Sequence, residues 1–348
     1  MDFYKDKKIL VTGGAGSIGS EIVRKLSTLG PSVIRAFDND ETALFNLTSQ
    51  VDGKQLIVRP LYGDIGDVDR LEMAMEGVDI VFHAAAMKHV SICEYNPFEA
   101  VKTNVIGTQN VITAALNQNV DKFILISTDK AVNPLNVMGT TKQLAEKLTI
   151  SSNHYKGLKR TKLSCVRFGN VLNSRGSVVP IFLEQIKKGG PVTVTNPDMT
   201  RFMMTIPEAV EFILQSAEIS MGREIFIKKM KAVKISDLAE AMVEYFAPKY
   251  GYNTDEINIE VVGDRDGEKM DEELFSVNEV ENVYENNESY VVLPQFIFAQ
   301  NLGKQIIDEG PHSKVKTEIF SSKESLVSDK CEIFELIKIM DGNISTSI

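Results

Sequence analysis

Short apolar runs alternate with amphipathic stretches through the first half of the chain. The runs are rich in β-branched residues, as is typical of strands buried on both faces of a parallel sheet. We expect strands at Lys8–Thr12, Val33–Asp38, Leu56–Tyr62, Ile80–His83, Lys122–Ser127 and Lys162–Phe168. We expect helices between them at Ile18–Leu29, Glu41–Val51, Val68–Met75, Pro97–Gln118 and Val137–Tyr155. This order predicts an α/β fold, a doubly wound parallel sheet with helices on both faces.

The start of the helix at Pro97–Gln118 carries capping signals. Asn96 is expected to cap it, and Glu99 stands where a capping box requires an acid. One buried stripe is predicted by apolar or small side chains spaced four and three apart, namely Val101, Val105, Thr108, Ile112 and Ala115.

The alternation stops after about residue 172. Further helices are expected at Val179–Lys188, Ile206–Ser220, Ile235–Phe246 and Cys331–Met340. Residues 280–325 are polar and weakly periodic, so loops are expected there. We therefore expect a first domain over residues 1–172, with a return near 203–228, and a smaller C-terminal region formed by 173–202 and 229–348.

Composition and charge narrow the class of protein. The 348 residues are 43% hydrophobic and 25% charged, which is typical of a soluble globular protein. The net charge of −10 disfavours binding to nucleic acid, and no apolar run is long enough to insert into a membrane. The charged first residues leave no expectation of a signal peptide. Three scattered cysteines and four histidines without ligand spacing predict neither disulfides nor a metal site, and we expect a cytoplasmic location.

A glycine-rich segment follows the first expected strand. In Thr-Gly-Gly-Ala-Gly-Ser-Ile-Gly, Gly13 permits a tight turn, Gly16 lets backbone amides approach a pyrophosphate, and Gly19 allows close helix–strand packing. Ser17 and Ile18 begin the helix whose N-terminus favours the anion. The pattern predicts a dinucleotide site; the alternative is an ordinary glycine turn.

Carboxylates at the ends of the next strands refine the expected cofactor. Asp38 closes the second strand, where it can accept from both ribose hydroxyls and would repel a 2′-phosphate. NAD is therefore expected rather than NADP. Asp64 and Ile65 fall where a third strand would meet the adenine.

A polar segment ends the fifth expected strand. Ser127, Thr128, Asp129 and Lys130 should lie at the carboxyl edge of the sheet, where ligands bind in such folds. Met138 and Lys142 follow on a helix, four residues apart and hence on one face.

The chain resembles the extended short-chain dehydrogenase/reductases, which have a Rossmann fold. Within them it is similar to the UDP-N-acetylglucosamine 4,6-dehydratases, often called polysaccharide-biosynthesis proteins. The matching segments appear in family order across roughly residues 8–275 and are Thr12–Gly19, Ala84–Val90, Glu94–Pro97, Thr103–Asn104, Ser127–Ala131, Met138–Lys142, Arg167–Val171, Ser174–Pro180, Thr200–Phe202 and Arg265–Lys269. The tail beyond about residue 300 is poorly covered.

Met138 departs from most of the superfamily, which carries a tyrosine there as the base for the alcohol. A thioether has no proton to exchange. Either the chain is a non-catalytic homologue with Met138 as core packing, or another group accepts the proton, with Thr128 and Asp129 nearest in sequence. A branch of the dehydratases looks similar in carrying methionine at this position.

The resemblance implies a three-step reaction with tightly bound, recycled NAD: oxidation at carbon 4 of the sugar, loss of the 6-hydroxyl as water, and hydride return to carbon 6. It makes Asp129 the acid at the 6-hydroxyl and Lys130 the base at carbon 5. Lysine is a base only if its pKa falls, through burial or nearby positive charge. Lys142 is expected to hold the nicotinamide ribose and supply that charge, and Thr128 to bond the 4-hydroxyl.

Further site residues follow from the same matching segments. Ala84, Ala85 and Asn104 are expected near the cofactor, with Asn104 ordering the active-site helix or serving as an ordinary core amide. The nucleotide sugar is expected to contact Lys88, His89, Asn170, Arg175, Arg201, Arg265 and Glu268, the arginines because their guanidinium groups suit pyrophosphate oxygens. His83 is expected to be a satisfied core histidine. The domain over 1–172 would then bind NAD, and the C-terminal region the sugar nucleotide.

Several alternatives stay open. A 4-epimerase also oxidises carbon 4, but it needs no Asp129–Lys130 pair for elimination. A dehydratase that inverts carbon 5, or one that stops at a 5,6-ene, fits equally well, and a non-catalytic NAD-binding regulator would account for Met138. Superfamily members usually associate through long helices, so we expect a homo-oligomer, a dimer or larger, through Pro97–Gln118 and Val137–Tyr155.

Overall fold

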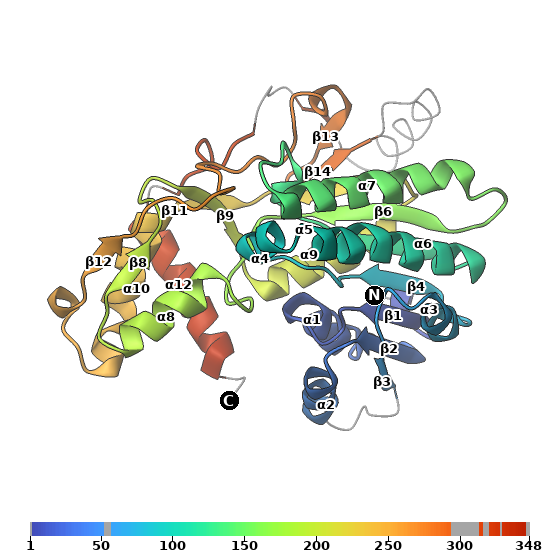
Figure 1. Cartoon of the computed structure of the whole chain (residues 1–348), viewed down its shortest axis with the longest axis horizontal. Helices are drawn as coiled ribbons and strands as arrows, with labels where there is room; N and C mark the ends of the chain where they lie inside the picture. Colours follow the sequence, from blue (N-terminus) through green and yellow to red (C-terminus); the bar gives the residue numbers. More distant parts are fainter. Residues whose placement is uncertain (1, 52–56, 294–312, 316–319, 328, 346–348) are drawn as a thin grey trace.

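The computed structural model has a large sheet-based lobe and a smaller helical lobe beside it (Figure 1). It describes residues 2–51, 57–293, 313–315, 320–327 and 329–345. None of the helices in these ranges combines the length and apolar character needed to cross a membrane.

A ten-stranded sheet forms the large lobe. Its strands follow the spatial order β15, β13, β14, β10, β6, β5, β4, β1, β2 and β3, and they are parallel from β10 to β3. The parallel strands are β1 (Lys8–Thr12), β2 (Val33–Asp38), β3 (Val58–Tyr62), β4 (Ile80–His83), β5 (Lys122–Ile126), β6 (Lys162–Arg167) and β10 (Ile225–Lys228). The prediction of a doubly wound parallel sheet is confirmed. Chain order reverses at β1, which pairs with both β2 and β4, so a ligand crevice is expected beyond the carboxyl ends of these strands.

Helices cover both faces of the sheet. One face packs on α1 (Ser17–Leu26), α2 (Glu41–Gln50) and α9 (Ile206–Ile219). The other packs on α3 (Val68–Met75), α6 (Thr108–Asn117) and α7 (Val137–Tyr155). Short 3₁₀ turns occur at Asp2–Tyr4, Asp129–Ala131, Pro248–Tyr250, Thr254–Glu256 and Val280–Asn282. The periodicity located these helices to within a few residues because each buries one apolar stripe.

The stretch predicted as one helix at Pro97–Gln118 has a more detailed structure. It consists of α5 (Pro97–Val101), a π-helix at Lys102–Gly107, and α6. Asn96 stands at the N-cap of α5 as predicted, but the predicted side-chain capping bonds were wrong: the Asn96 side chain donates to the Ile92 carbonyl, and Glu99 pairs with Lys102. The reason is α4 (Val90–Tyr95), a short helix missed in the sequence, which ends directly at Asn96.

The smaller lobe has a hydrophobic core of its own. It packs α8 (Val178–Lys187), α10 (Ile235–Phe246) and α12 (Lys330–Ser345) around β8 (Val192–Val194), which pairs with β12 (Ile259–Val261). A three-stranded sheet of β7 (Asn170–Val171), β9 (Thr200–Met204) and β11 (Lys231–Lys234) joins this lobe to the large one. The expected terminal helix is thus present as α12.

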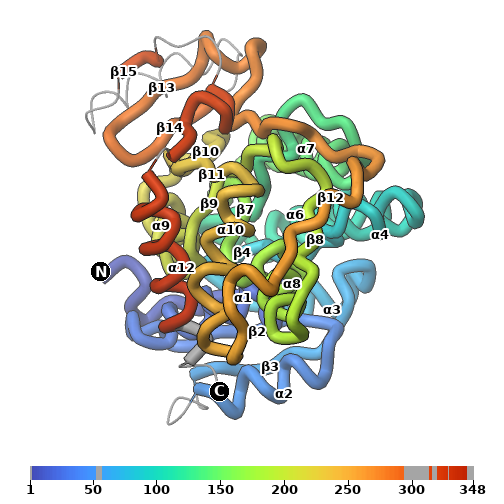
Figure 2. The backbone as a smooth tube through the Cα atoms, turned by 90° about the vertical axis from the view of Figure 1, so that its left-hand side faces the viewer, coloured from blue at the N-terminus to red at the C-terminus, as the bar shows by residue number. Residues whose placement is uncertain are grey.

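The prediction of loops over residues 280–325 was wrong at three short strands, whereas residues 322–325 form a turn as expected. β13 (Val283–Glu285), β14 (Ser289–Val292) and β15 (Ser313–Lys314) extend the main sheet beyond β10 in antiparallel fashion (Figure 2). Residues 294–312 and 316–319 lie outside the described ranges. Because these strands are only two to four residues long, they left almost no alternation to read in the sequence.

Candidate functional site

The turn between β1 and α1 forms a narrow backbone cradle. Gly13 has a φ of +64°, and a Cβ there would lie 2.6 Å from the amide nitrogen of Ala85. A Cβ on Gly19 would lie 2.0 Å from the Gly13 carbonyl oxygen. Gly16 caps α1 without a side-chain hydrogen bond, so the first turn points backbone amides outward. These backbone contacts require glycine at Gly13 and Gly19, and the free amides at the N-terminus of α1 suit the pyrophosphate of a dinucleotide.

Two carboxylates stand beside the cradle at the ends of β2 and β3. Asp38 accepts from the Ala15 amide at 2.9 Å and from the Asp40 amide at 3.1 Å. Asp64 accepts from Asn39 at 2.9 Å, and Ile65 packs against the π-helix at Gly107. Both carboxylates thus lie where a ribose and an adenine would extend from the pyrophosphate.

Arg175 reaches the same cradle from the smaller lobe. Its backbone amide donates to Ser17 Oγ at 3.0 Å, and its guanidinium donates to the Ala15 carbonyl at 3.2 Å. The segment carrying Arg175 therefore lies across the glycine cradle, between the expected cofactor and substrate sites.

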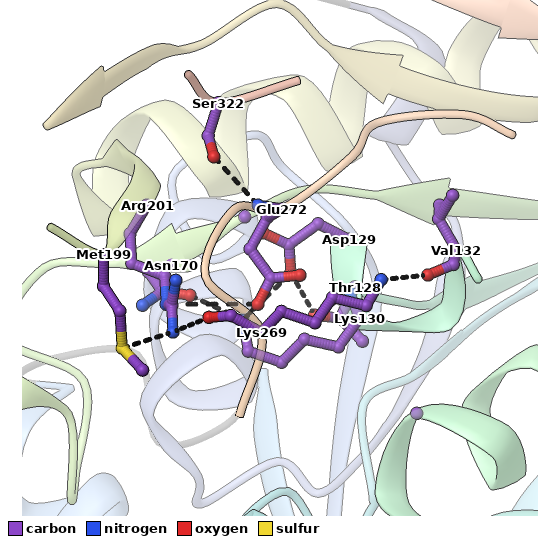
Figure 3. Close-up of polar contacts among 12 residues, drawn as sticks. Thr128, Asp129, Lys130, Val132, Asn170, Met199, Arg201, Lys269, Glu272 and Ser322 are labelled. Atoms are coloured by element: carbon purple, nitrogen blue, oxygen red, sulfur yellow. Dashed lines mark hydrogen bonds and ion pairs between the residues drawn. The ribbon is translucent and has the colours of Figure 1, made fainter. Parts of the chain in front are cut away.

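The turn after β5 holds the expected acid–base residues (Figure 3). Asp129 is fully buried, and its Oδ1 accepts from Thr128 Oγ1 at 2.9 Å and from Lys130 Nζ at 3.0 Å. Lys130 Nζ also donates to Asn170 Oδ1 at 2.7 Å. The three consecutive residues thus form one hydrogen-bonded unit, to which β7 contributes Asn170.

Glu272 completes this cluster and was missed in the sequence. Its Oε1 lies 3.6 Å from Lys130 Nζ, and its side chain is 3% exposed. It stands in Met-Asp-Glu-Glu-Leu, three residues beyond the matching segment Arg265–Lys269. That proximity was the only available signal, since a glutamate among other acidic residues has no distinguishing pattern.

The charges around Lys130 correct one expectation. Burial lowers the pKa of Lys130, but the carboxylates of Asp129 and Glu272 outweigh burial, so that its pKa is raised. The positive group that opposes them is Arg201 rather than the expected Lys142. The pKa of Lys130 therefore does not fall towards neutrality, because the two carboxylates outweigh both burial and Arg201.

Lys142 is instead the lysine whose pKa falls. Burial lowers the pKa of Lys142 to about 8, partly opposed by Glu146 on the same helix. Its Nζ donates to the Ile126 carbonyl at 2.6 Å, at the end of β5. Lys142 is therefore fixed against the edge of the sheet, beside the acid–base turn.

Asn104 and Met138 lie on neighbouring parts of the helical wall. Asn104 exchanges hydrogen bonds with the backbone of Met87 and donates to Thr141 Oγ1 at 3.0 Å, which ties α7 to the loop after β4. Met138 is 3% exposed and packs with Cys93 and Ala100 in a small apolar cluster. Its side chain thus has a packing role in this structure.

His83 is a satisfied core histidine, as expected. It is fully buried between Thr12 Oγ1 at 2.6 Å and Thr108 Oγ1 at 3.0 Å, and burial lowers its pKa to about 3. The lowered pKa favours the neutral ring at neutral pH.

A cavity of about 240 Å³ opens between the two lobes beside Lys130. Its lining includes the catalytic or substrate candidates Lys130, Asn170, Arg201, Arg265 and Glu268, together with Glu272. Buried side-chain oxygens without a hydrogen-bond partner in the described part of the chain gather on this wall: Ser177 Oγ, Glu268 Oε2 and Glu272 Oε2. Unpaired buried polar atoms are costly, so the cavity is suited to a ligand whose hydroxyl or amide groups can hydrogen-bond to them.

The remaining substrate candidates differ in their exposure and in how many hydrogen bonds they already make to the protein. Arg201 is buried, and it donates to the carbonyls of Thr200, Met270 and Lys269, which places much of its guanidinium in the wall. Arg265 is exposed at the rim. Lys88 and His89 are exposed before α4, and Lys88 Nζ lies 3.5 Å from Ser174 Oγ.

Comparisons with known proteins agree with this architecture. The sequence model of the family described as "Polysaccharide biosynthesis protein" matches residues 9–294. A protein of Methanocaldococcus jannaschii named an uncharacterized membrane protein is 53% identical over 97% of both chains. The X-ray structure of Pen from Bacillus thuringiensis is 40% identical, covers 96% of this chain and 98% of its own, and superposes with a TM-score of 0.89.

Two further relatives carry names of enzymes. The inverting UDP-N-acetylglucosamine 4,6-dehydratase of Campylobacter jejuni is 37% identical over 97% of this chain and 99% of its own. The UDP-glucose 4-epimerase of Rickettsia rickettsii is 36% identical over 97% of both chains. The likeness to both enzymes extends along nearly the whole chain.

Proposed function

Because this chain belongs to the polysaccharide biosynthesis protein family, we propose that it is an NAD-dependent UDP-N-acetylglucosamine 4,6-dehydratase. The product would be a UDP-4-keto-6-deoxy-N-acetylhexosamine for the synthesis of a surface polysaccharide or another glycan. The observation that carries this proposal is the hydrogen-bonded Thr128–Asp129–Lys130 unit, whose Lys130 lines the cavity between the lobes. An acid and a base in contact are what the elimination of water requires.

The cofactor would lie along the cradle at the carboxyl edge of the sheet. Gly13, Gly16 and Gly19 would admit its pyrophosphate, and Asp38 would accept from the adenosine ribose. NAD held there would supply the acceptor for the hydride of carbon 4 and the donor for its return to carbon 6. Lys142 would hold the nicotinamide ribose from its fixed place beside β5.

The contact between Lys130 and Asp129 supplies a route for the proton that Lys130 must lose. Lys130 Nζ donates to Asp129 Oδ1 at 3.0 Å, so one proton can pass to the carboxylate. Neutral Lys130 would then remove the proton from carbon 5, while Asp129 would deliver its new proton to the departing 6-hydroxyl, which leaves as water. Both groups end the elimination in their starting protonation states. The proton that the 4-hydroxyl loses on oxidation balances the proton that carbon 5 gains when hydride returns to carbon 6. Thr128 Oγ1 would bond the 4-hydroxyl.

The nucleotide would occupy the cavity wall formed by the smaller lobe. Arg265 at the rim suits a phosphate, and the unpaired Glu268 Oε2 would accept from a ribose hydroxyl of uridine. Arg175 is favoured for phosphate oxygens near the cradle, and Arg201 for fixing the loop that carries Lys269. Lys88 and His89 remain candidates for the sugar.

The direct test is incubation of the purified protein with UDP-N-acetylglucosamine in deuterated water, without added cofactor. We expect loss of one water, with deuterium at carbon 5, seen by mass and NMR spectra. The ring couplings report inversion at carbon 5. Unchanged substrate across a panel of UDP-sugars, with NAD bound, would contradict the proposal and favour a non-catalytic regulator.

A 4-epimerase is the second candidate, supported by the likeness to the Rickettsia enzyme. It would need only oxidation and reduction at carbon 4. The buried Asp129–Lys130–Glu272 cluster counts against it, because three ionisable groups serve no purpose where no proton leaves carbon 5. The same incubation separates the two, since an epimerase gives a product of unchanged mass.

Asp38→Ala is expected to weaken NAD binding selectively. The change removes the acceptor for the ribose and the bond to the Ala15 amide, and hydrogen bonds to a charged group contribute about 1.5–3 kcal/mol. Calorimetry should show a loss of about tenfold or more in NAD affinity, with UDP affinity unchanged. Asp69→Ala, an exposed aspartate on α3, is the control. Unchanged NAD affinity would remove Asp38 from the ribose site.

Met138→Ala is expected to reduce stability more than activity. Truncating a buried methionine costs about 2–5 kcal/mol, whereas the side chain has no proton to transfer. Denaturation should show the loss, and the dehydration rate should stay close to wild type where the variant is folded. Met138→Leu keeps the volume and serves as control. A collapse in rate with the fold intact would mean that Met138 shapes the reacting site.

We also propose that the protein is a cytoplasmic homo-oligomer, associating through α4 to α7. Large apolar side chains are exposed along these helices, including Tyr95, Phe98, Val101, Ile106 and Leu144. Light scattering on the purified protein should show a dimer or larger. A protein that stays monomeric at micromolar concentration would contradict the proposal that this surface is an oligomer interface.

A further inference from the structure

Two buried carboxyl groups flank the same lysine in the acid–base site. Asp129 Oδ1 lies 3.0 Å from Lys130 Nζ, and Glu272 Oε1 lies 3.6 Å from the same nitrogen. Glu272 lines the cavity between the lobes, whereas Asp129 is not part of its lining. The proposed mechanism gives Asp129 a role. It gives none to Glu272, although Glu272 is the carboxyl group of this pair that lines the cavity.

The backbone of Glu272 is clamped by the C-terminal segment. The Glu272 amide donates to Ser322 Oγ at 2.8 Å, and the Ser322 amide donates to the Glu272 carbonyl at 2.8 Å (Figure 3). Ser322 is fully buried, and its hydroxyl lies 2.6 Å from Thr200 Oγ1 on β9. The main chain of Glu272 is therefore fixed on two sides, which holds its carboxyl group beside Lys130.

The carboxyl group of Glu272 has one engaged oxygen and one unengaged oxygen. Oε1 faces Lys130 Nζ and lies 4.0 Å from Arg201 Nε, while Oε2 is buried without a hydrogen-bond partner in the described part of the chain. A buried carboxylate ordinarily collects several donors. Asp129 Oδ2 is likewise buried without a partner, so two buried carboxyl groups share the one positive charge of Lys130. Because like charges at one site oppose each other's ionisation, one carboxyl group is favoured in its uncharged form, and Glu272, which lies farther from Lys130 Nζ, fits that form.

The charges that face Glu272 come from each element around it. Burial raises its pKa; Lys130 lowers it, Asp129 raises it, and Arg201 and Lys269 lower it, and the net effect is a raised pKa. Asp129 and Lys130 belong to the turn after β5, Arg201 to β9, and Lys269 to the same loop as Glu272. Because burial is the largest of these effects on the pKa, the uncharged form of Glu272 is favoured at a pH where ordinary glutamates are ionised.

Building on the proposed dehydratase reaction, we propose that Glu272 works as an uncharged carboxylic acid, which frees Lys130 to act as base and donates from Oε2 to an oxygen of the bound sugar. Lys130 then faces one carboxylate, Asp129, rather than two. Its proton passes to Asp129, and Lys130 can accept the proton of carbon 5. Glu272 keeps its own proton throughout, so the proton balance of the elimination is unchanged.

Glutamine separates this role from that of a charged residue. Glu272→Gln keeps the shape, cannot ionise, and retains a donor at the position of Oε2. We expect it to keep kcat within about tenfold of wild type. Loss of a general acid or base would instead lower the rate by a factor of about 10²–10⁴. Glu272→Ala loses both the donor and the packing, so its KM should rise and its kcat should fall.

The pH profile supplies a readout that packing alone would not change. A carboxyl with a raised pKa is neutral below that pKa and charged above it. Wild-type kcat should therefore fall as rising pH ionises Glu272 and holds Lys130 charged. In Glu272→Gln this fall should move to higher pH. Glu273→Gln is the matched control, because its neighbouring carboxylate accepts from Asn133 at 2.7 Å and should leave the wild-type profile.

Infrared spectra make the test independent of turnover. The wild type with NAD and UDP bound should show a protonated-carboxyl band near neutral pH that Glu272→Gln lacks and Glu273→Gln retains. Absence of that band, a Gln variant as inactive as the Ala variant, or an unshifted pH profile would each overturn the inference. A wild type that releases no dehydrated sugar would instead overturn the proposed function, and the infrared comparison would still decide the state of Glu272.

Discussion

Replacing Lys130 with alanine is expected to abolish the loss of water from the sugar while leaving NAD and UDP binding nearly intact. Lys130 Nζ is the one nitrogen in contact with Asp129, Asn170 and Glu272 in the described structure, and it lies on the cavity wall. Without it, the proton on carbon 5 has no nearby base. General acid–base groups contribute about 10²–10⁴ in rate, and we expect a loss in this range or beyond.

The measurement separates oxidation from elimination. Oxidation at carbon 4 is followed by the absorbance of reduced nicotinamide, elimination by the mass of the sugar, and binding by calorimetry. Asp129→Asn should also stop elimination, because the amide cannot relay a proton. The exposed Lys102→Ala on the helical wall is the control. If Lys130→Ala turned over at the wild-type rate, the base would have to be another group.

Arg167→Met is expected to be the most destabilising of these changes. Arg167 is 2% exposed, and its guanidinium pairs with Glu146 at 2.7 Å and Glu279 at 3.0 Å and donates to the Leu274 carbonyl at 2.8 Å. Its removal leaves two carboxylates without their cation. Breaking a buried pair in this way costs about 3–5 kcal/mol.

Urea denaturation of the variant checks this value. Arg160→Met is the control, since its pair with Asp121 is largely exposed and should contribute less than about 1 kcal/mol. Adding Glu146→Gln and Glu279→Gln to Arg167→Met should recover part of the loss, because the unpaired charges are then gone. A variant as stable as wild type would show that Arg167 is dispensable to the packing of β6.

The pH dependence of this loss has a definite sign. Burial raises the pKa of Glu279, but the pairing with Arg167 outweighs it, so that the pKa is lowered. A lowered pKa gives stability that is present above the unfolded pKa and disappears as pH falls through the folded one. Arg167→Met lacks this contribution. The gap between variant and wild type should therefore narrow as the pH falls through the acid range.

The Arg167 network also reaches the acid–base turn. Glu146 accepts from Ser127 Oγ at 2.6 Å, one residue before Thr128, and it opposes the lowering of the Lys142 pKa. The bonds from Arg167 and Ser127 hold Glu146 between α7 and the ends of β5 and β6. Weakening the network should therefore lower the dehydration rate as well as the stability.

The sequence determined the fold of the first half and the glycine turn at which we expect the cofactor. Strands such as Lys8–Thr12, Val33–Asp38 and Ile80–His83 were predicted to the residue, because a strand buried on both faces needs an unbroken apolar run. The phosphate loop was equally clear, since only glycine tolerates the approaches at Gly13 and Gly19. Both requirements concern neighbouring residues in the chain, so each is visible as a short pattern in the sequence.

Only the tertiary structure decided the charges of the acid–base site. Glu272 reaches Lys130 from a loop more than a hundred residues away, and it is held there by Ser322 from the tail. The pKa of a buried group depends on which charges surround it in space. The raised pKa of Lys130 therefore could not be predicted from the order of residues along the chain. The short strands β13 to β15 were likewise decided by the tertiary structure, because they form only by pairing with β10 and with one another. Interactions between segments distant in sequence are set by the fold, and no pattern within either segment records them.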